Sequence, residues 1–191
     1  MDGWWAASYV VLWLLVVVLC VVVVALARQI GTLHLRLGPR GALEMDDEGP
    51  PLGEAPQPHD VVDLAGRLVS LGGPGRAQLL LFVSPGCHVC EQVLPSLPAV
   101  SRRDLAPYVV TDLDVPETKS QFEGRRIEAP IVPGRAVAQA YRVPGTPYVV
   151  VLDDLGVVRA KGTVNNLEQM EGLVDTARRR IEARDQELQR N

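Results

Sequence analysis

The residues with the clearest chemical potential are the two cysteines of the segment Cys87-His88-Val89-Cys90. Cysteines at positions i and i+3 of a helix lie on one face, so their sulfur atoms can bond or separate with little backbone change. A thiolate in the first turn is favoured by the helix dipole and by unpaired backbone N–H groups. The spacing therefore predicts a redox-active pair in which Cys87 is the nucleophile and Cys90 resolves the mixed disulfide.

Other uses of a Cys-x-x-Cys segment lack their remaining ligands. A structural zinc site needs two more soft ligands, and the third cysteine, Cys20, lies in an apolar N-terminal stretch. The histidines at 34, 59 and 88 have no paired spacing. Attachment of a c-type haem needs a histidine directly after the second cysteine, where this chain has Glu91. We therefore expect no metal and no cofactor beyond the redox-active disulfide itself.

The elements that must position the pair can be read from the surrounding pattern. Residues 78–84 form a continuous apolar run bounded by turn residues, which is typical of a buried central strand. A turn at Ser84-Pro85-Gly86 follows, and a helix is expected from Cys87 to about Arg103, with a kink at Pro95. The cysteine pair is thus predicted to lie where a central strand passes into a helix.

The rest of the C-terminal part has an α/β pattern. Hairpins are expected at 61–64 with 68–71 and at 148–152 with 157–160, a second buried strand at 108–113, and helices at 134–141 and after Asn165. The last helix is expected to project or fray beyond Arg178, and Asp63 and Glu91 are expected to be surface charges. These elements predict a central mixed sheet with helices on both faces.

The N-terminal part has the composition of a membrane anchor. No charged residue occurs from Gly3 to Ala27, and 25 residues at about 1.5 Å each exceed a hydrocarbon core of about 30 Å. Trp4 and Trp5 are placed as interfacial aromatics. A cleaved signal peptide would have a basic start, a shorter apolar run and an A-x-A cleavage site. We expect an uncleaved transmembrane helix, with Cys20 an apolar residue of no redox role.

The chain therefore divides into five parts of different composition. These are a short N-terminal tail at 1–3, a transmembrane anchor at 4–27, a juxtamembrane segment and Pro/Gly/acidic linker at 28–58, an α/β domain at 59–180 and a charged C-terminal tail at 181–191. The net charge of −4 gives no reason to expect a nucleic-acid partner.

The order of strand, Cys-x-x-Cys helix, strand, helix, Thr-Pro hairpin and helix resembles the thioredoxin superfamily over residues 52–180. The resemblance implies a thioredoxin fold in which Thr146-Pro147 supplies a cis-proline facing the disulfide. A proline there leaves the preceding backbone free to pair with an extended substrate. Thr146 and Pro147 are therefore candidate substrate-binding residues.

A more specific resemblance comes from the segments Ala27–His34, Gly41–Leu43 and Gly162–Asn166, which are similar to the MauD family of methylamine utilisation proteins. That resemblance implies disulfide chemistry on an exported client, the small subunit of methylamine dehydrogenase. It also implies a membrane or periplasmic electron-transfer partner of unknown identity, besides the lipid bilayer. The direction of electron flow stays open between oxidation, reduction and isomerisation.

Two positions depart from the related families. His88 stands where the family typically has proline. A partly protonated imidazole there would stabilise the Cys87 thiolate and make the site more oxidising, whereas an exposed side chain would have a small effect. Leu81 stands where thioredoxin carries a buried acid, so Cys90 loses a proton acceptor and general protein reduction is less expected.

Three alternatives remain open at this point. The first is a TlpA-like reductant for cytochrome c maturation, which shares the chemistry and differs in client. The second is a peroxiredoxin-like peroxidase, because Ser84 precedes Cys87 by three residues, although Leu80 replaces the proline expected before it. The third is a non-enzymatic membrane scaffold.

The sequence gives two opposing indications of the side of the membrane on which the domain lies. Arg28, Arg36 and Arg40 follow the apolar stretch while only Asp2 precedes it, so the positive-inside rule places the domain in the cytoplasm. Disulfide chemistry on an exported client places it outside. We expect a single-pass protein of the bacterial inner membrane with a periplasmic domain.

Overall fold

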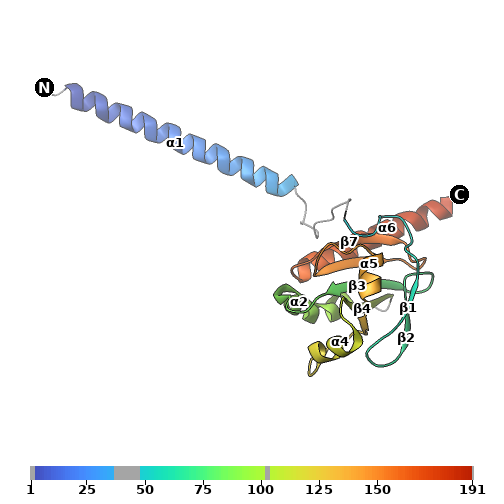
Figure 1. The fold of residues 1–191 in the computed structure, drawn as a ribbon. Helices are drawn as coiled ribbons and strands as arrows, with labels where there is room; N and C mark the ends of the chain where they lie inside the picture. Colours follow the sequence, from blue (N-terminus) through green and yellow to red (C-terminus); the bar gives the residue numbers. More distant parts are fainter. Residues whose placement is uncertain (1–2, 37–47, 102–103, 191) are drawn as a thin grey trace. The chain divides into compact units, whose positions relative to one another are not determined.

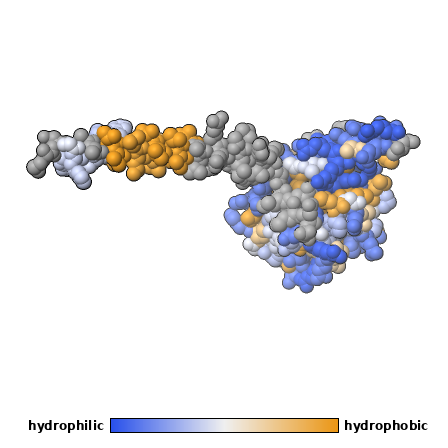
Figure 2. All heavy atoms as spheres, turned by 90° about the horizontal axis from the view of Figure 1, so that it is seen from above, coloured by the Kyte–Doolittle hydropathy of each residue, from blue (hydrophilic) through white to orange (hydrophobic). Residues whose placement is uncertain are grey.

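The computed structural model describes residues 3–36, 48–101 and 104–190, in two compact units, Met1–Pro39 and Arg40–Asn191. The first unit contains one helix, α1 (Gly3–Arg36). Its stretch Gly3–Val24 is long and apolar enough to cross a membrane. Figure 2 shows an apolar band along this stretch, next to paler residues at its N-terminal end. The predicted N-terminal apolar helix is therefore present and continues past residue 27.

The second unit is built on a five-stranded sheet with the order β5-β4-β3-β6-β7. The central strand β3 (Ala77–Val83) pairs in parallel with β4 (Leu105–Thr111) and antiparallel with β6 (Tyr148–Leu152). The edges are β5 (Ile131–Pro133) and β7 (Val158–Thr163). A separate hairpin joins β1 (His59–Val62) to β2 (Leu68–Leu71). The predicted strands and hairpins are confirmed, with shifted ends.

Side chains of β3 alternate between two cores because successive residues of a strand point to opposite faces. Leu79, Leu81 and Val83 pack with the helices α2 (His88–Val93), α3 (Leu97–Val100) and α6 (Leu167–Arg190). Leu80 and Phe82 pack with α5 (Arg135–Ala140) and the β1–β2 hairpin. Helices thus cover both faces of a mixed sheet, as predicted (Figure 1).

The helix after the cysteine pair is interrupted as its prolines require. The segment η1 (Leu94–Ser96), a short 3₁₀ helix, separates α2 from α3 and has Pro95 in its first turn. A proline inside a helix lacks an N–H donor and its ring crowds the preceding turn. The predicted kink is confirmed, but the helix ends at Val100, before the predicted end at Arg103, which lies outside the described residues.

One helix between β4 and β5 was not predicted. The helix α4 (Val115–Phe122) begins at Asp114, whose carboxylate accepts the Glu117 backbone N–H at 2.9 Å, while the Glu117 side chain accepts the Asp114 N–H. This capping box has a sequence signature, an Asp followed three residues later by Glu. The signal was therefore present in the chain.

Part of the predicted linker belongs to the folded domain. Gly53 N–H donates to the Val158 carbonyl, and Val158 N–H donates to the Glu54 carbonyl, each at 2.9 Å. Gly53 and Glu54 are thereby paired with the first residue of β7, which a composition-based linker assignment does not reveal. The linker residues at 37–47 lie outside the described part of the chain.

The C-terminal helix also differs from the prediction at both ends. The Asn166 side chain, one residue after the predicted cap, accepts the Gln169 backbone N–H at 2.9 Å. The helix α6 then continues without interruption to Arg190, so the predicted charged tail is its last part. This part contacts the domain through Arg184, whose largely buried side chain pairs with Asp153 at 2.8 Å.

Asp63 was expected to be a surface charge, and this prediction is wrong. Its carboxylate is buried in the β1–β2 turn, where it accepts backbone N–H groups of Ala65 at 2.9 Å and Arg67 at 2.8 Å. The Arg67 guanidinium pairs with it at 2.8 Å. Burial alone would raise the pKa of Asp63, but the bonds from Arg67 and Ala65 outweigh it and hold the pKa below its ordinary value.

Candidate functional site

The cysteine pair lies at the carboxyl end of the central strand. After β3 ends at Val83, a turn through Gly86, which has a φ of 71°, brings the chain to Cys87. Only glycine adopts such a φ at low cost. Cys87 caps α2, and a disulfide joins it to Cys90 with a Cα–Cα distance of 5.2 Å.

The two sulfur atoms have unequal access to solvent. Cys87 is half-buried, whereas Cys90 is 2 % exposed and belongs to the core that contains Leu81. The Cys90 backbone N–H points at the Cys87 sulfur at 3.2 Å, which favours a thiolate at Cys87 once the disulfide is reduced. Cys87 is therefore the more accessible of the two sulfur atoms, and the roles of Cys87 as nucleophile and Cys90 as resolving thiol stay predictions.

The Thr146–Pro147 segment meets this pair from the entry to β6. Its peptide bond is cis, as predicted. The Thr146 carbonyl lies 3.7 Å from the Cys87 sulfur, and the Thr146 hydroxyl is hydrogen-bonded to the Ser84 hydroxyl. The structure thus brings together residues 59 positions apart in the sequence. The role of Thr146 and Pro147 in binding a substrate stays a prediction.

His88 is exposed at the start of α2. Its Nε2 atom lies 3.1 Å from the side-chain amide nitrogen of Gln92, one turn further along the helix. Gln92 was not singled out from the sequence, although its i+4 spacing from His88 would have indicated the contact. The effect of His88 on the Cys87 thiolate stays a prediction.

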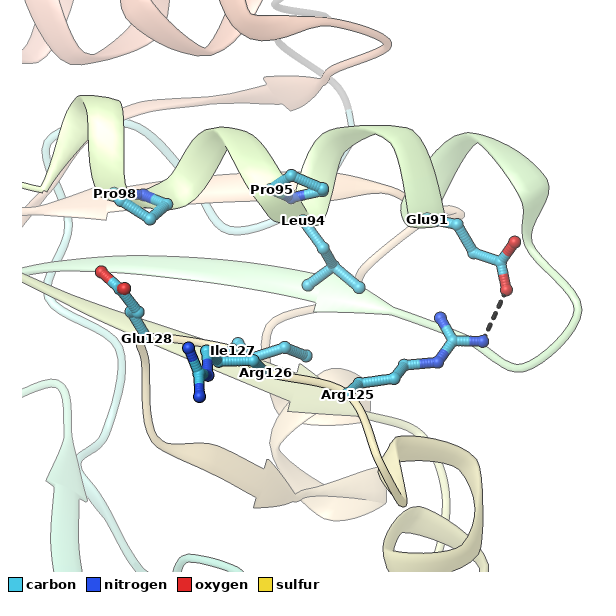
Figure 3. Close-up of a pocket in the computed structure, with 8 residues that line it drawn as sticks. All are labelled: Glu91, Leu94, Pro95, Pro98, Arg125, Arg126, Ile127 and Glu128. Carbon is cyan, nitrogen blue, oxygen red and sulfur yellow. Dashed lines mark hydrogen bonds and ion pairs between the residues drawn. The ribbon is translucent and has the colours of Figure 1, made fainter.

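A groove of about 350 Å³ runs beside the helix that carries the cysteines (Figure 3). Figure 3 shows Leu94 pointing across it toward the loop that carries Ile127. The remaining lining residues are Glu91, Pro95, Pro98, Arg125, Arg126 and Glu128.

An ion pair at one end of this groove links α2 to the facing loop. The Glu91 carboxylate and the Arg125 guanidinium are 2.7 Å apart, and both side chains remain exposed, as expected for Glu91. The hydrogen bond from Arg125 lowers the pKa of Glu91 below its ordinary value. Glu91 follows Cys87 by one helical turn, and neither Cys87 nor Cys90 lines the groove.

Comparison with known proteins identifies the family. No protein-family model matches the chain. The chain is 36% identical over 174 residues to the methylamine utilization protein MauD of Methylorubrum extorquens, covering 88% of this chain and 84% of that protein. It is 34% identical over 183 residues to MauD of Paracoccus denitrificans, covering 93% and 91%. The chain belongs to the MauD family.

The globular unit of this MauD-family chain has the thioredoxin fold. It superimposes on the pneumococcal exposed lipoprotein thioredoxin of Streptococcus pneumoniae with a TM-score of 0.57 at 15% identity, covering 64% of this chain and 99% of that one. The predicted fold class is confirmed.

Within residues 3–36, 48–101 and 104–190 of this family member, no three His, Cys, Asp or Glu side chains are grouped as metal ligands would be. The exposed Cys20 of α1 forms no disulfide with another described residue.

Proposed function

We propose that the chain is a membrane-tethered thiol–disulfide oxidoreductase whose working groups are Cys87 and Cys90. The observation that carries this proposal is a disulfide between a half-buried and a buried sulfur at a helix start, with the Cys90 N–H aimed at Cys87. The family and the thioredoxin fold support it. The sulfur atoms carry the electrons themselves, so the exchange needs no further cofactor.

In the oxidising direction, a client thiolate attacks the Cys87 sulfur. The Cys87–Cys90 bond breaks, a disulfide forms between the client and Cys87, and Cys90 leaves as a thiolate that takes up a proton. A second client thiolate then attacks the client sulfur of this mixed disulfide, and Cys87 leaves with the electron pair. The client has lost two electrons and two protons, which the thiol pair now holds.

The same steps in reverse reduce a client disulfide. In isomerisation, the thiolate of reduced Cys87 attacks a client disulfide, so the client bond breaks and a mixed disulfide forms while one client sulfur leaves as a thiolate. A different client thiolate then attacks the client sulfur of the mixed disulfide, so that a new client disulfide forms and Cys87 leaves again as a thiolate. Because Cys90 is buried, it reacts only with Cys87, and the mixed disulfide forms at the accessible sulfur. Cys87 is therefore the sulfur that forms the mixed disulfide in either direction.

For the client, we propose an exported disulfide-containing protein of methylamine utilisation, with the small subunit of methylamine dehydrogenase as the expected case. The names of the relatives support a place in methylamine utilisation. An unidentified membrane or periplasmic partner would then restore the redox state of the pair.

A trapping experiment tests both the chemistry and the client. Cys90→Ala should accumulate a reducible mixed disulfide with the client in a bacterium that produces methylamine dehydrogenase, because no thiol remains to resolve it. Cys87→Ala combined with Cys90→Ala is the matched control and should trap nothing. Adducts with other exported proteins instead would overturn the proposed identity of the client. The absence of any adduct would overturn the oxidoreductase function.

The proposed location of the domain is the periplasm, with α1 as an uncleaved anchor. The length and composition of Gly3–Val24 support the anchor. Alkaline phosphatase fused after Asn191 should be active, because this enzyme requires disulfides that form outside the cytoplasm. A well-expressed but inactive fusion would place the domain in the cytoplasm.

One contact counts against a peroxidase. A peroxidase would need the Ser84 hydroxyl free to face Cys87, whereas here it bonds to Thr146. We expect slow consumption of hydrogen peroxide compared with reduction of a protein disulfide such as that of insulin. Rapid peroxide turnover without a dithiol client would favour the peroxidase instead.

A further inference from the structure

The strand end that leads into the cysteine pair is connected to the cis-proline loop through two hydroxyl groups. The Ser84 Oγ and Thr146 Oγ1 atoms are hydrogen-bonded, although 62 positions separate them in the sequence. Both residues are half-buried, so competition from water at this bond is reduced. The bond therefore restrains the position of Thr146 relative to the turn that carries Cys87.

The backbone of Thr146 contacts the reacting sulfur. Its carbonyl oxygen lies 3.7 Å from Cys87 Sγ, while the Cys90 N–H lies 3.2 Å from the same atom. The sulfur is thus placed between a donor and an acceptor. In the reduced protein, the N–H group favours a thiolate, and the carbonyl favours a thiol because it accepts an S–H and repels negative charge.

We propose that Ser84 is a positioning residue that holds the Thr146 carbonyl against Cys87 and thereby limits the fraction of Cys87 present as thiolate. This inference rests on the proposed function, in which the Cys87 thiolate either attacks a client disulfide or leaves from the mixed disulfide. Loss of the Ser84 hydroxyl would let the carbonyl move away and would free the Thr146 hydroxyl to donate to the thiolate. Both changes favour ionisation of Cys87.

The other groups that affect this sulfur stay constant when Ser84 is changed. On α2 the titratable neighbours are His88, Cys90 and Glu91, and the last is paired with Arg125. The strands β3 and β6 contribute apolar side chains to the core against which Cys87 packs. A change seen on removing the Ser84 hydroxyl can therefore be assigned to the contact with Thr146.

The experiment is the pH profile of Cys87 alkylation by iodoacetamide in the reduced full-length protein, followed on the Cys87 peptide by mass spectrometry. Only the thiolate reacts, so the midpoint reports its formation. Ser84→Ala should move the midpoint to lower pH and raise the rate on the acidic side by about three- to tenfold, the usual effect of one lost hydrogen bond. Ser84→Thr keeps the hydroxyl and should restore the original profile.

A second variant keeps the proposal testable if Ser84→Ala is poorly folded. Thr146→Val removes the same bond from its other end and should shift the profile in the same direction. The double variant should shift it no further than the larger single change, because only one bond is lost. An unchanged midpoint in both single variants, a shift to higher pH, or additive shifts would overturn the proposal.

Failure of this inference is distinguishable from failure of the proposed function. The alkylation profile depends on the surroundings of Cys87 alone and requires no client. An unchanged profile together with normal trapping by Cys90→Ala rejects the role of Ser84 and leaves the oxidoreductase function intact. A shifted profile together with no trapped client supports the role of Ser84 and rejects the oxidoreductase function.

Discussion

The β3–β6 strand pair has two ends, and different kinds of hydrogen bond fix the loops at each end. At one end, called the cysteine end below, β3 leads into the turn before Cys87. The contacts there are the Ser84–Thr146 hydroxyl pair, and a backbone amide and a backbone carbonyl next to Cys87. At the opposite end, where β6 leaves for β7, the fully buried carboxylate of Asp153 accepts backbone N–H groups of Leu155 and Val157, each at 2.9 Å.

Two arginines complete the surroundings of Asp153. Arg159 pairs with it at 2.7 Å and Arg184 of α6 at 2.8 Å, and both guanidinium-bearing side chains are largely buried. Burial alone would raise the pKa of Asp153, but the bond from Arg159 and the two backbone N–H groups outweigh it and lower the pKa. This turn therefore depends on charged hydrogen bonds, which are stronger than neutral ones.

The comparison indicates a division of roles within one domain. Neutral contacts near Cys87 are weak enough to rearrange when a client sulfur approaches, whereas removing one partner from a buried charged group is costly. Stability is concentrated away from the reacting atoms. Changes at the two ends should therefore affect activity and stability separately.

The largest expected effect on activity is at the cysteine end. Cys87→Ser should lower the rate of insulin disulfide reduction by at least about a hundredfold, because no thiol remains to form the mixed disulfide. Its free energy of unfolding should stay within about 1 kcal/mol of the reduced wild-type protein. Cys20→Ser, in the apolar helix, is the control and should keep full activity; loss of activity there would contradict the assigned site.

The largest expected effect on stability is at the opposite end. Asp153→Ala should lower the free energy of unfolding in denaturant by about 3–5 kcal/mol, because it removes the carboxylate that pairs with the largely buried Arg159 and that accepts two backbone N–H groups, as well as one of the partners of Arg184. The exposed neighbour Asp154, whose carboxylate pairs with Arg184 at 2.9 Å, is the matched control, and Asp154→Ala should cost less than about 1 kcal/mol. Equal losses in the two variants would remove the proposed contrast.

Acid should weaken the Asp153 end. The pKa of Asp153 is lower in the folded chain than its ordinary value of 3.8, so its contribution is present above that value and is lost as the pH falls through the folded pKa. Denaturant unfolding from about pH 6 to pH 2 should show a stability decline that is shallower in Asp153→Asn. Asp63, whose pKa is also lowered, should account for part of the remaining slope.

A smaller effect is expected from the helix that covers this turn. Arg184→Ala removes one of the two arginines from Asp153 and should cost about 2 kcal/mol, because Arg159 remains in place. Hydrogen exchange should rise in the last turns of α6. Arg190→Ala, at the exposed end of the same helix, should leave both measurements unchanged; an equal effect there would assign the loss to helix propensity instead.

The smallest effect is expected at the exposed ion pair beside the groove. Arg125→Ala should leave the free energy of unfolding almost unchanged, because both partners are solvated. Thermal unfolding of Arg125→Ala and of Glu91→Gln would check this. A loss as large as that of Asp153→Ala would show that charged contacts also stabilise the cysteine end.

Local patterns in the sequence determined the cysteine pair, its strand and its helix. The apolar run of β3, the turn before Cys87 and the kink at Pro95 involve neighbours in the chain, so spacing and residue type were sufficient. The apolar stretch of α1 was predictable for the same reason, since length and composition define it. The capping box of α4 could also have been found in this way.

Only the tertiary structure decided the contacts between distant segments. Asp63 and Asp153 are charged residues in turns, which ordinarily indicate solvent exposure, and their burial depends on partners that folding supplies. The bond from Ser84 to Thr146 joins two loops that no sequence period connects. Thus the sequence by itself determined the cysteine pair and the strand and helix that carry it. The approach of β3 and β6 decided what surrounds them, because side chains far apart in the chain become neighbours only when the sheet closes.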